Sequence, residues 1–132
     1  MKTTLSFKMI EHRFLGNDLP DISYEAAKVI IIPAPLEETV SYGGGTAKGP
    51  QEILKASGYV ELYDEEIGKE PCEMGIHTSR GISSELSQSE FLTELENLTY
   101  QVCRTGKYPV IIGGEHSLTI APVKAFRQIH GN

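Results

Sequence analysis

The chain has 132 residues, which is the size of one domain. Its formal net charge of −6 argues against nucleic acid and anionic membrane surfaces as partners, because both repel an acidic protein. The longest apolar run covers residues 29–32, far short of the ~20 residues that span a bilayer. Cys72 and Cys103 are too few and too far apart for a disulfide framework or a zinc knuckle, which predicts reduced thiols in a cytoplasmic protein.

The first clear element along the chain is a buried strand. Residues 1–25 mix charged and turn-forming residues without a sustained period, which predicts an N-terminal arm that can hold one turn of helix. Residues 28–33 contain four consecutive β-branched residues closed by Pro33. Such a run is typical of a strand buried on both faces, as in parallel sheets covered by helices.

A glycine-rich loop is predicted next, over residues 34–49. Its three consecutive glycines, residues 43–45, give the backbone access to positive φ and allow another group to approach closely. Pro50 suits the first turn of a helix, since its missing N–H costs nothing there. We therefore predict a short helix over residues 51–57, with Gly58 as its C-cap.

The middle of the chain carries weaker signals. Residues 59–63 alternate weakly between apolar and polar side chains, which predicts a short strand. Residues 64–85 are predicted to be irregular, and a second short strand is possible over residues 74–77.

A long amphipathic helix is predicted over residues 88–105. Ser87 and Glu90 have the spacing of a capping box at its start. Gly106 is suited to the position just beyond its end. One apolar stripe at helical spacing predicts the face that packs on the core, and it consists of Phe91, Leu95, Leu98 and Val102.

Another buried strand is predicted over residues 108–112, and a last helix over residues 118–129. The alternation of strands and helices predicts the α/β class with a mainly parallel sheet. Between these two elements the sequence reads Gly-Gly-Glu-His-Ser, residues 113–117. In open α/β sheets, ligands bind at the carboxyl ends of strands, where this segment lies.

The residues of this segment leave two interpretations open. His116 is either a metal ligand or general base held on a stiff turn, or a hydrogen-bonded structural histidine. Glu115 and His116 are neighbours on extended chain and point to opposite faces, so they are not expected to bind one ion. Glu115 is therefore predicted to be a structural carboxylate or to support a ligand.

The Gly-Gly-Glu-His-Ser segment resembles the first metal motif of the ureohydrolases, the arginase and agmatinase family, and the Glu variant is most like agmatinase. Five further segments resemble the same family in the same order: residues 13–16, 28–35, 37–46, 48–54 and 61–66. The resemblance implies a three-layer α-β-α fold of the arginase kind. Residues 1–132 would be the N-terminal part of one such domain, incomplete at the C-terminus, with residues 1–25 as its arm.

The resemblance also implies the chemistry. Family members use two bridged Mn²⁺ ions, held by His and Asp, and a metal-bound hydroxide attacks the guanidinium carbon of the substrate. For an agmatinase, agmatine and water give putrescine and urea, a step of polyamine biosynthesis. His116 is the metal ligand that the resemblance assigns here; it assigns no catalytic or substrate-binding residue in this chain. It also implies a trimeric or hexameric assembly.

The two other metal motifs of the family, Asp-x-His-x-Asp and Asp-x-Asp, do not occur. The aspartates are Asp18, Asp21 and Asp64, all before His116. His12, His77 and His130 are predicted to be ordinary exposed or half-buried residues. At most one Mn²⁺ ligand is therefore present, and activity of this chain alone is not expected.

Several alternatives remain open. The chain can be a non-catalytic remnant or a split-gene subunit, or part of an arginase or another guanidino or formimino hydrolase. A flavodoxin-like binding domain fits the α/β rhythm but leaves residues 113–117 unexplained. The loop of residues 37–46 can either shape a substrate pocket or simply turn the chain. Because the strands at 29–32 and 110–112 are predicted to be central, an incomplete sheet would leave an apolar edge exposed, which predicts marginal stability, self-association or completion by a partner.

Overall fold

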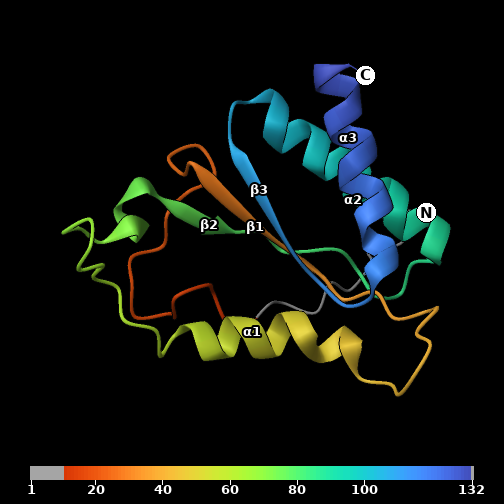
Figure 1. Ribbon diagram of the computed structural model, residues 1–132, viewed down its shortest axis with the longest axis horizontal. Helices are drawn as coiled ribbons and strands as arrows, with labels where there is room; N and C mark the ends of the chain where they lie inside the picture. Colours follow the sequence, from red (N-terminus) through yellow and green to blue (C-terminus); the bar gives the residue numbers. More distant parts are fainter. Residues whose placement is uncertain (1–10, 132) are drawn as a thin grey trace, which may run out of the picture.

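The computed structural model describes residues 11–131 and contains a parallel three-stranded sheet (Figure 1). The strands are β1 (Val29–Ala34), β2 (Ile76–Thr78) and β3 (Tyr108–Gly113), in the order β2-β1-β3. β1 pairs with β3 along its whole length, from Val29 opposite Tyr108 to Ala34 opposite Gly113. The predicted strands at residues 28–33, 74–77 and 108–112 are confirmed.

Three helices cover the sheet. α2 (Gln88–Arg104) and α3 (Ile120–His130) lie on one face and α1 (Gly49–Ser57) lies on the other (Figure 1). Short 3₁₀ turns cover Thr46–Lys48, Pro71–Met74 and His116–Thr119. This arrangement confirms the predicted α-β-α layers. Within the described residues, no helix combines the length and the apolar character that a membrane crossing requires.

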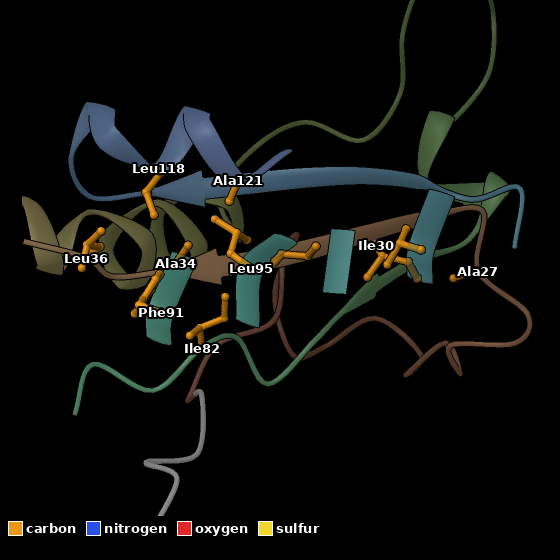
Figure 2. Packing of buried hydrophobic residues seen from close by; sticks show 11 residues of the cluster. Ala27, Ile30, Ala34, Leu36, Ile82, Phe91, Leu95, Leu118 and Ala121 are labelled. Atoms are coloured by element: carbon orange, nitrogen blue, oxygen red, sulfur yellow. The ribbon is translucent and has the colours of Figure 1, made fainter. Parts of the chain in front are cut away.

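The side chains of β1 divide between the two faces of the sheet. Ile30, Ile32 and Ala34 face α2 and α3, where they join the main core (Figure 2). Ile31 faces α1 and contacts the smaller cluster formed with Leu54 and Ile112. Burial on both faces explains why β1 has no polar side chain.

Helix α2 has the ends that the sequence predicts. The Ser87 hydroxyl accepts a hydrogen bond from the backbone N–H of Glu90, and the Glu90 carboxylate accepts one from the backbone N–H of Ser87. The Ser87 hydroxyl also donates to the Glu90 carboxylate (2.7 Å), and this bond, followed by that of the Ser87 N–H, lowers the pKa of Glu90. At the other end, Gly106 has φ +74°, and its N–H donates to Cys103 while that of Lys107 donates to Val102, which is a Schellman motif.

The predicted apolar stripe of α2 is nearly correct. Phe91, Leu95 and Val102 are fully buried, while Leu98 is half-buried at the margin and Thr99 is buried instead. The buried Thr99 hydroxyl has a hydrogen-bond partner, since it donates to the carbonyl of Leu95, one turn earlier.

The strand predicted at residues 59–63 is wrong. The N–H groups of Tyr59 and Val60 donate to Ala56 and Ser57 and continue the end of α1 as a turn. Tyr59 and Tyr63 are 88% and 58% exposed. A weak alternation does not make a strand where no neighbouring strand offers hydrogen bonds. In the arm, residues 11–25 form turns without helix, and residues 1–10 lie outside the described part.

β3 was predicted to be a central strand, but in the described part of the chain it pairs only with β1 and forms an edge of the sheet. Its side chains on the α1 side are poorly covered, since Tyr108 is 70% and Val110 is 43% exposed. The apolar edge that the sequence predicts is therefore present, and it belongs to β3.

Candidate functional site

The carboxyl ends of β1 and β3 bring the two most informative segments of the sequence together. The N–H of Gly114 donates to the carbonyl of Ala34 (3.1 Å), and that of Glu115 donates to the carbonyl of Leu36 (3.0 Å). These bonds extend the contact between the two segments beyond the ends of β1 and β3. The loop after β1 and the turn after β3 thus form one rigid rim.

The two glycines of the turn lie in close packing, and at Gly114 the neighbouring atoms are backbone atoms that cannot move aside. A Cβ at Gly114 would overlap the backbone of Leu36, and a Cβ at Gly113 would overlap the side chain of Leu118. Neither glycine has a positive φ, so space decides here and backbone conformation does not. The Gly-Gly pair therefore allows the turn after β3 to lie against the loop after β1.

Glu115 ties these segments together. Its side chain is buried, and its carboxylate accepts four hydrogen bonds, from the N–H of Glu38 (2.6 Å), the N–H (2.7 Å) and hydroxyl (2.6 Å) of Thr39, and the hydroxyl of Ser117 (2.5 Å). The bonds from Ser117 and Thr39 lower the pKa of Glu115 to about 2. Glu115 is thus a charged structural anchor, as predicted, with no oxygen directed to a ligand.

A second carboxylate shapes the loop itself. Glu37 accepts hydrogen bonds from the N–H groups of Gly45 (2.9 Å) and Ala47 (2.8 Å) and from the hydroxyl of Thr46 (3.1 Å). These bonds, that of the Ala47 N–H first, lower the pKa of Glu37. The loop predicted at residues 34–49 is therefore closed on a glutamate at its start.

The loop encloses a hollow of about 550 Å³ beside the carboxyl end of β1. Its lining includes the charged or polar residues Glu37, Glu38, Lys48 and Ser84. The hollow is on the scale of a small-molecule site. It lies beside the carboxyl end of β1, next to Leu36 and Glu37.

His116 opens the 3₁₀ turn that follows Glu115. Its side chain is exposed and forms no hydrogen bond with residues 11–131. Residues 11–131 therefore offer the imidazole none of the hydrogen bonds that the structural interpretation of His116 expects. Among residues 11–131, the hydrogen bonds nearest to the imidazole are those of its neighbours in sequence, Glu115 and Ser117.

The other histidines and the aspartates lie in ordinary surroundings. His77 is half-buried and its Nδ1 lies 2.7 Å from the carbonyl of Ile22, while the exposed His130 stacks on Phe126. Asp21 pairs with Arg13 at 3.2 Å. Asp64 accepts hydrogen bonds from the N–H groups of a local turn.

The described residues do not fit a complete two-metal centre. Imidazole together with carboxylates suits Mn²⁺. However, no cluster of three His, Cys, Asp or Glu side chains exists within residues 11–131, and the oxygens of Glu37 and Glu115 accept hydrogen bonds from the chain itself. The His116 side chain is exposed and has no hydrogen bond with residues 11–131, which is compatible with its predicted role as a metal ligand.

The contacts that organise this rim were missed from the sequence. The sequence indicated that Glu115 is structural, but its partner Thr39 lies 76 residues away and no local pattern connects the two. The anchoring role of Glu37 had a weaker signal: a glutamate before a Gly-rich loop whose N–H groups need an acceptor.

The comparisons with known proteins agree with this geometry. Residues 27–132 match the model of the Arginase family. The chain is 37% identical over 112 residues to the N(1)-aminopropylagmatine ureohydrolase of Synechocystis sp., and 27% identical over 115 residues to the agmatinase of Pyrococcus horikoshii. These alignments cover 80% and 86% of this chain but only 37% and 41% of the relatives.

A solved structure shows the same fold. The agmatine ureohydrolase of Thermoplasma volcanium matches 78% of this chain with a TM-score of 0.73 and 28% identity, and the match covers 35% of that structure. The chain thus spans about two fifths or less of the length of the relatives it matches. The family match over residues 27–132 is decisive, and the chain belongs to the arginase family.

Proposed function

We propose that this chain is the N-terminal portion of a ureohydrolase that cleaves a linear guanidino compound. The observation that carries the proposal is His116, exposed on a turn that Glu115 anchors at the carboxyl end of β3. The reaction proposed first is that of an agmatinase, in which agmatine and water give putrescine and urea. Arginine and other guanidino or formimino compounds are alternatives.

A second substrate is favoured by the relatives. The Synechocystis and Thermus thermophilus proteins, at 37% and 35% identity, are both N(1)-aminopropylagmatine ureohydrolases, whereas the Pyrococcus and Bacillus subtilis agmatinases are 27% and 26% identical. N(1)-aminopropylagmatine is therefore a substrate to test beside agmatine. Both compounds are cationic, which suits a chain of net charge −6.

The described residues would contribute one ligand and one wall of the site. Mn²⁺ is the proposed cofactor, and when bound it would supply a hydroxide at neutral pH. His116 would bind one ion, and the other ligands would have to come from outside residues 11–131. The non-catalytic alternative, a remnant or a split-gene subunit, follows if no such ligands are supplied.

The open edge of β3 is the surface proposed to receive the remaining ureohydrolase segments. Val110 and Tyr108 on β3 are exposed, and so are Ile120 and Val123 on α3. A parallel strand paired with β3 would cover the first two and bring further ligands to the carboxyl end of the sheet, beside His116. Assembly into a trimer or hexamer is also proposed, on the family resemblance.

The test is urea release by the chain expressed together with the coding sequence that follows Asn132, supplied with Mn²⁺. Agmatine, N(1)-aminopropylagmatine and arginine are compared as substrates, and His116→Ala and His130→Ala serve as the ligand variant and its matched control. Urea from one of the amine substrates that is lost in His116→Ala and kept in His130→Ala supports the proposal. A folded protein that releases urea from none of the three contradicts it and favours the non-catalytic alternative.

A further inference from the structure

Two walls that come from distant parts of the sequence meet at the carboxyl ends of β1 and β3. One is the loop after β1, which lines the hollow, and the other is the turn after β3, which carries His116. Two backbone bonds join the walls, from Gly114 to Ala34 and from Glu115 to Leu36. The remaining hydrogen bonds between them pass through the carboxylate of Glu115.

The two oxygens of that carboxylate accept different hydrogen bonds. Oε2 accepts the N–H groups of Glu38 and Thr39, at 2.6 and 2.7 Å, and thus fixes the backbone of the loop. Oε1 accepts the hydroxyls of Thr39 and Ser117, at 2.6 and 2.5 Å, and thus joins the loop to the residue after His116. A neutral amide cannot replace this pattern, because its NH₂ group would face donors.

His116 lies between two residues that this network holds. Glu115 precedes it with its backbone N–H bonded to Leu36, and Ser117 follows it with its hydroxyl bonded to Glu115. The imidazole itself has no hydrogen bond to the described residues that would set its orientation. We therefore expect a displacement of the loop at Thr39 to reach His116 through the Glu115 carboxylate, in addition to the two backbone bonds.

We propose that Glu115 is a positioning residue, which couples the orientation of His116 to that of the loop that lines the hollow. This coupling would fix the position of His116 relative to the loop before any reaction begins. The inference relies on the proposed function only where it treats His116 as a ligand. The coupling itself can be tested without metal and without substrate.

The test uses the isotopically labelled 132-residue chain and NMR. Glu115→Gln is the disruptive variant, and Glu38→Gln is its matched control, since it removes the same charge from a side chain that forms no hydrogen bond with residues 11–131. In Glu115→Gln, amide exchange at Glu38 and Thr39 should rise roughly tenfold or more, while exchange in α2 changes little. Glu38→Gln should leave both regions unchanged.

The decisive measurement changes the loop at Thr39 and observes the ring of His116. Thr39→Val removes one hydroxyl donor to Glu115 and should shift the ring resonances of His116, 77 positions along the chain, while Thr46→Val, which removes a hydroxyl bond to Glu37, should not. The proposal is overturned if Thr39→Val leaves the His116 ring resonances unchanged. It is also overturned if Glu115→Gln raises exchange in α2 as much as in the loop, because Glu115 would then serve global stability alone. Neither result bears on urea release, so the proposed function stands or fails separately.

Discussion

The two faces of the sheet are covered to different degrees. On one face, α2 and α3 enclose the main core, in which Phe91 and Leu95 are fully buried (Figure 2). On the other face, α1 contributes Leu54 to a small cluster with Ile31 and Ile112, and Val110 on β3 remains 43% exposed. The first face therefore contributes most of the buried apolar contacts of the domain, whereas the second face and the β3 edge leave apolar side chains exposed.

The largest expected effect comes from a matched pair of leucine truncations. Leu95→Ala should cost about 4 kcal/mol in the free energy of unfolding and Leu54→Ala about 2–3 kcal/mol, because the half-buried neighbours of Leu54 can relax into the space. Both side chains are almost completely buried, at 0% and 1% exposure, so burial alone would predict equal costs. Chemical denaturation of both variants measures the difference, and equal losses would contradict the comparison.

The rim at the carboxyl end should respond to acid, while the apolar contacts on both faces should not. The pKa of Glu115 in the folded chain is about 2, below its ordinary value of 4.5, so its contribution to stability is complete above about pH 5 and is lost as the pH falls toward 2. Glu115→Gln should therefore be less stable than the wild type near neutral pH, and the gap should narrow over this range. Denaturation at several pH values measures the gap; a constant gap would show that the carboxylate is not charged and bonded as described.

The N-termini of α2 and α1 also differ, because only α2 begins with a side-chain cap. Ser87→Ala removes the capping box of α2 and should cost about 1 kcal/mol. At the matched position before α1, Lys48 forms no side-chain cap, so Lys48→Ala should change the stability by less than about 0.5 kcal/mol. Thermal unfolding of the two variants compares them, and a large loss in Lys48→Ala would show that α1 is held more firmly than its cluster indicates.

The smallest effect on folding, with a distinct effect on association, is expected at the open edge. Val110→Lys should change the free energy of unfolding by less than about 0.5 kcal/mol but reduce self-association, because a charged side chain on an edge strand opposes pairing. Tyr59→Lys, on an exposed residue away from the edge, is the control. Sedimentation measures the self-association of each protein. If both variants self-associate as strongly as the wild type, the β3 edge is excluded as an interface.

The sequence predicted the elements whose causes are local. The four β-branched residues of β1 and the capping box of Ser87 and Glu90 are complete signals in themselves, and both elements formed where expected. The strand expected at residues 59–63 failed because a strand needs a neighbour, which no local pattern reports.

The candidate site was predictable to the same extent. The segment at residues 113–117 singled out His116 and the structural role of Glu115. The structure adds the contacts of the neighbouring residues. The missing side chain of Gly114 leaves room for the backbone of Leu36, and the Glu115 carboxylate accepts the N–H of Thr39. Those contacts join residues almost 80 positions apart and depend on the parallel pairing of β1 with β3, so they became visible only in the fold.

We propose that this chain contributes one Mn²⁺ ligand, His116, to a site whose other ligands would come from outside residues 11–131. The most direct test is Mn²⁺ titration by calorimetry on the 132-residue chain and on His116→Ala, with urea release from agmatine assayed in the same samples. We predict no tight binding and no urea from either protein, because a single imidazole is a weak site for this ion. Tight binding that depends on His116, together with urea release, would contradict the claim and show that copies of this chain complete the site themselves.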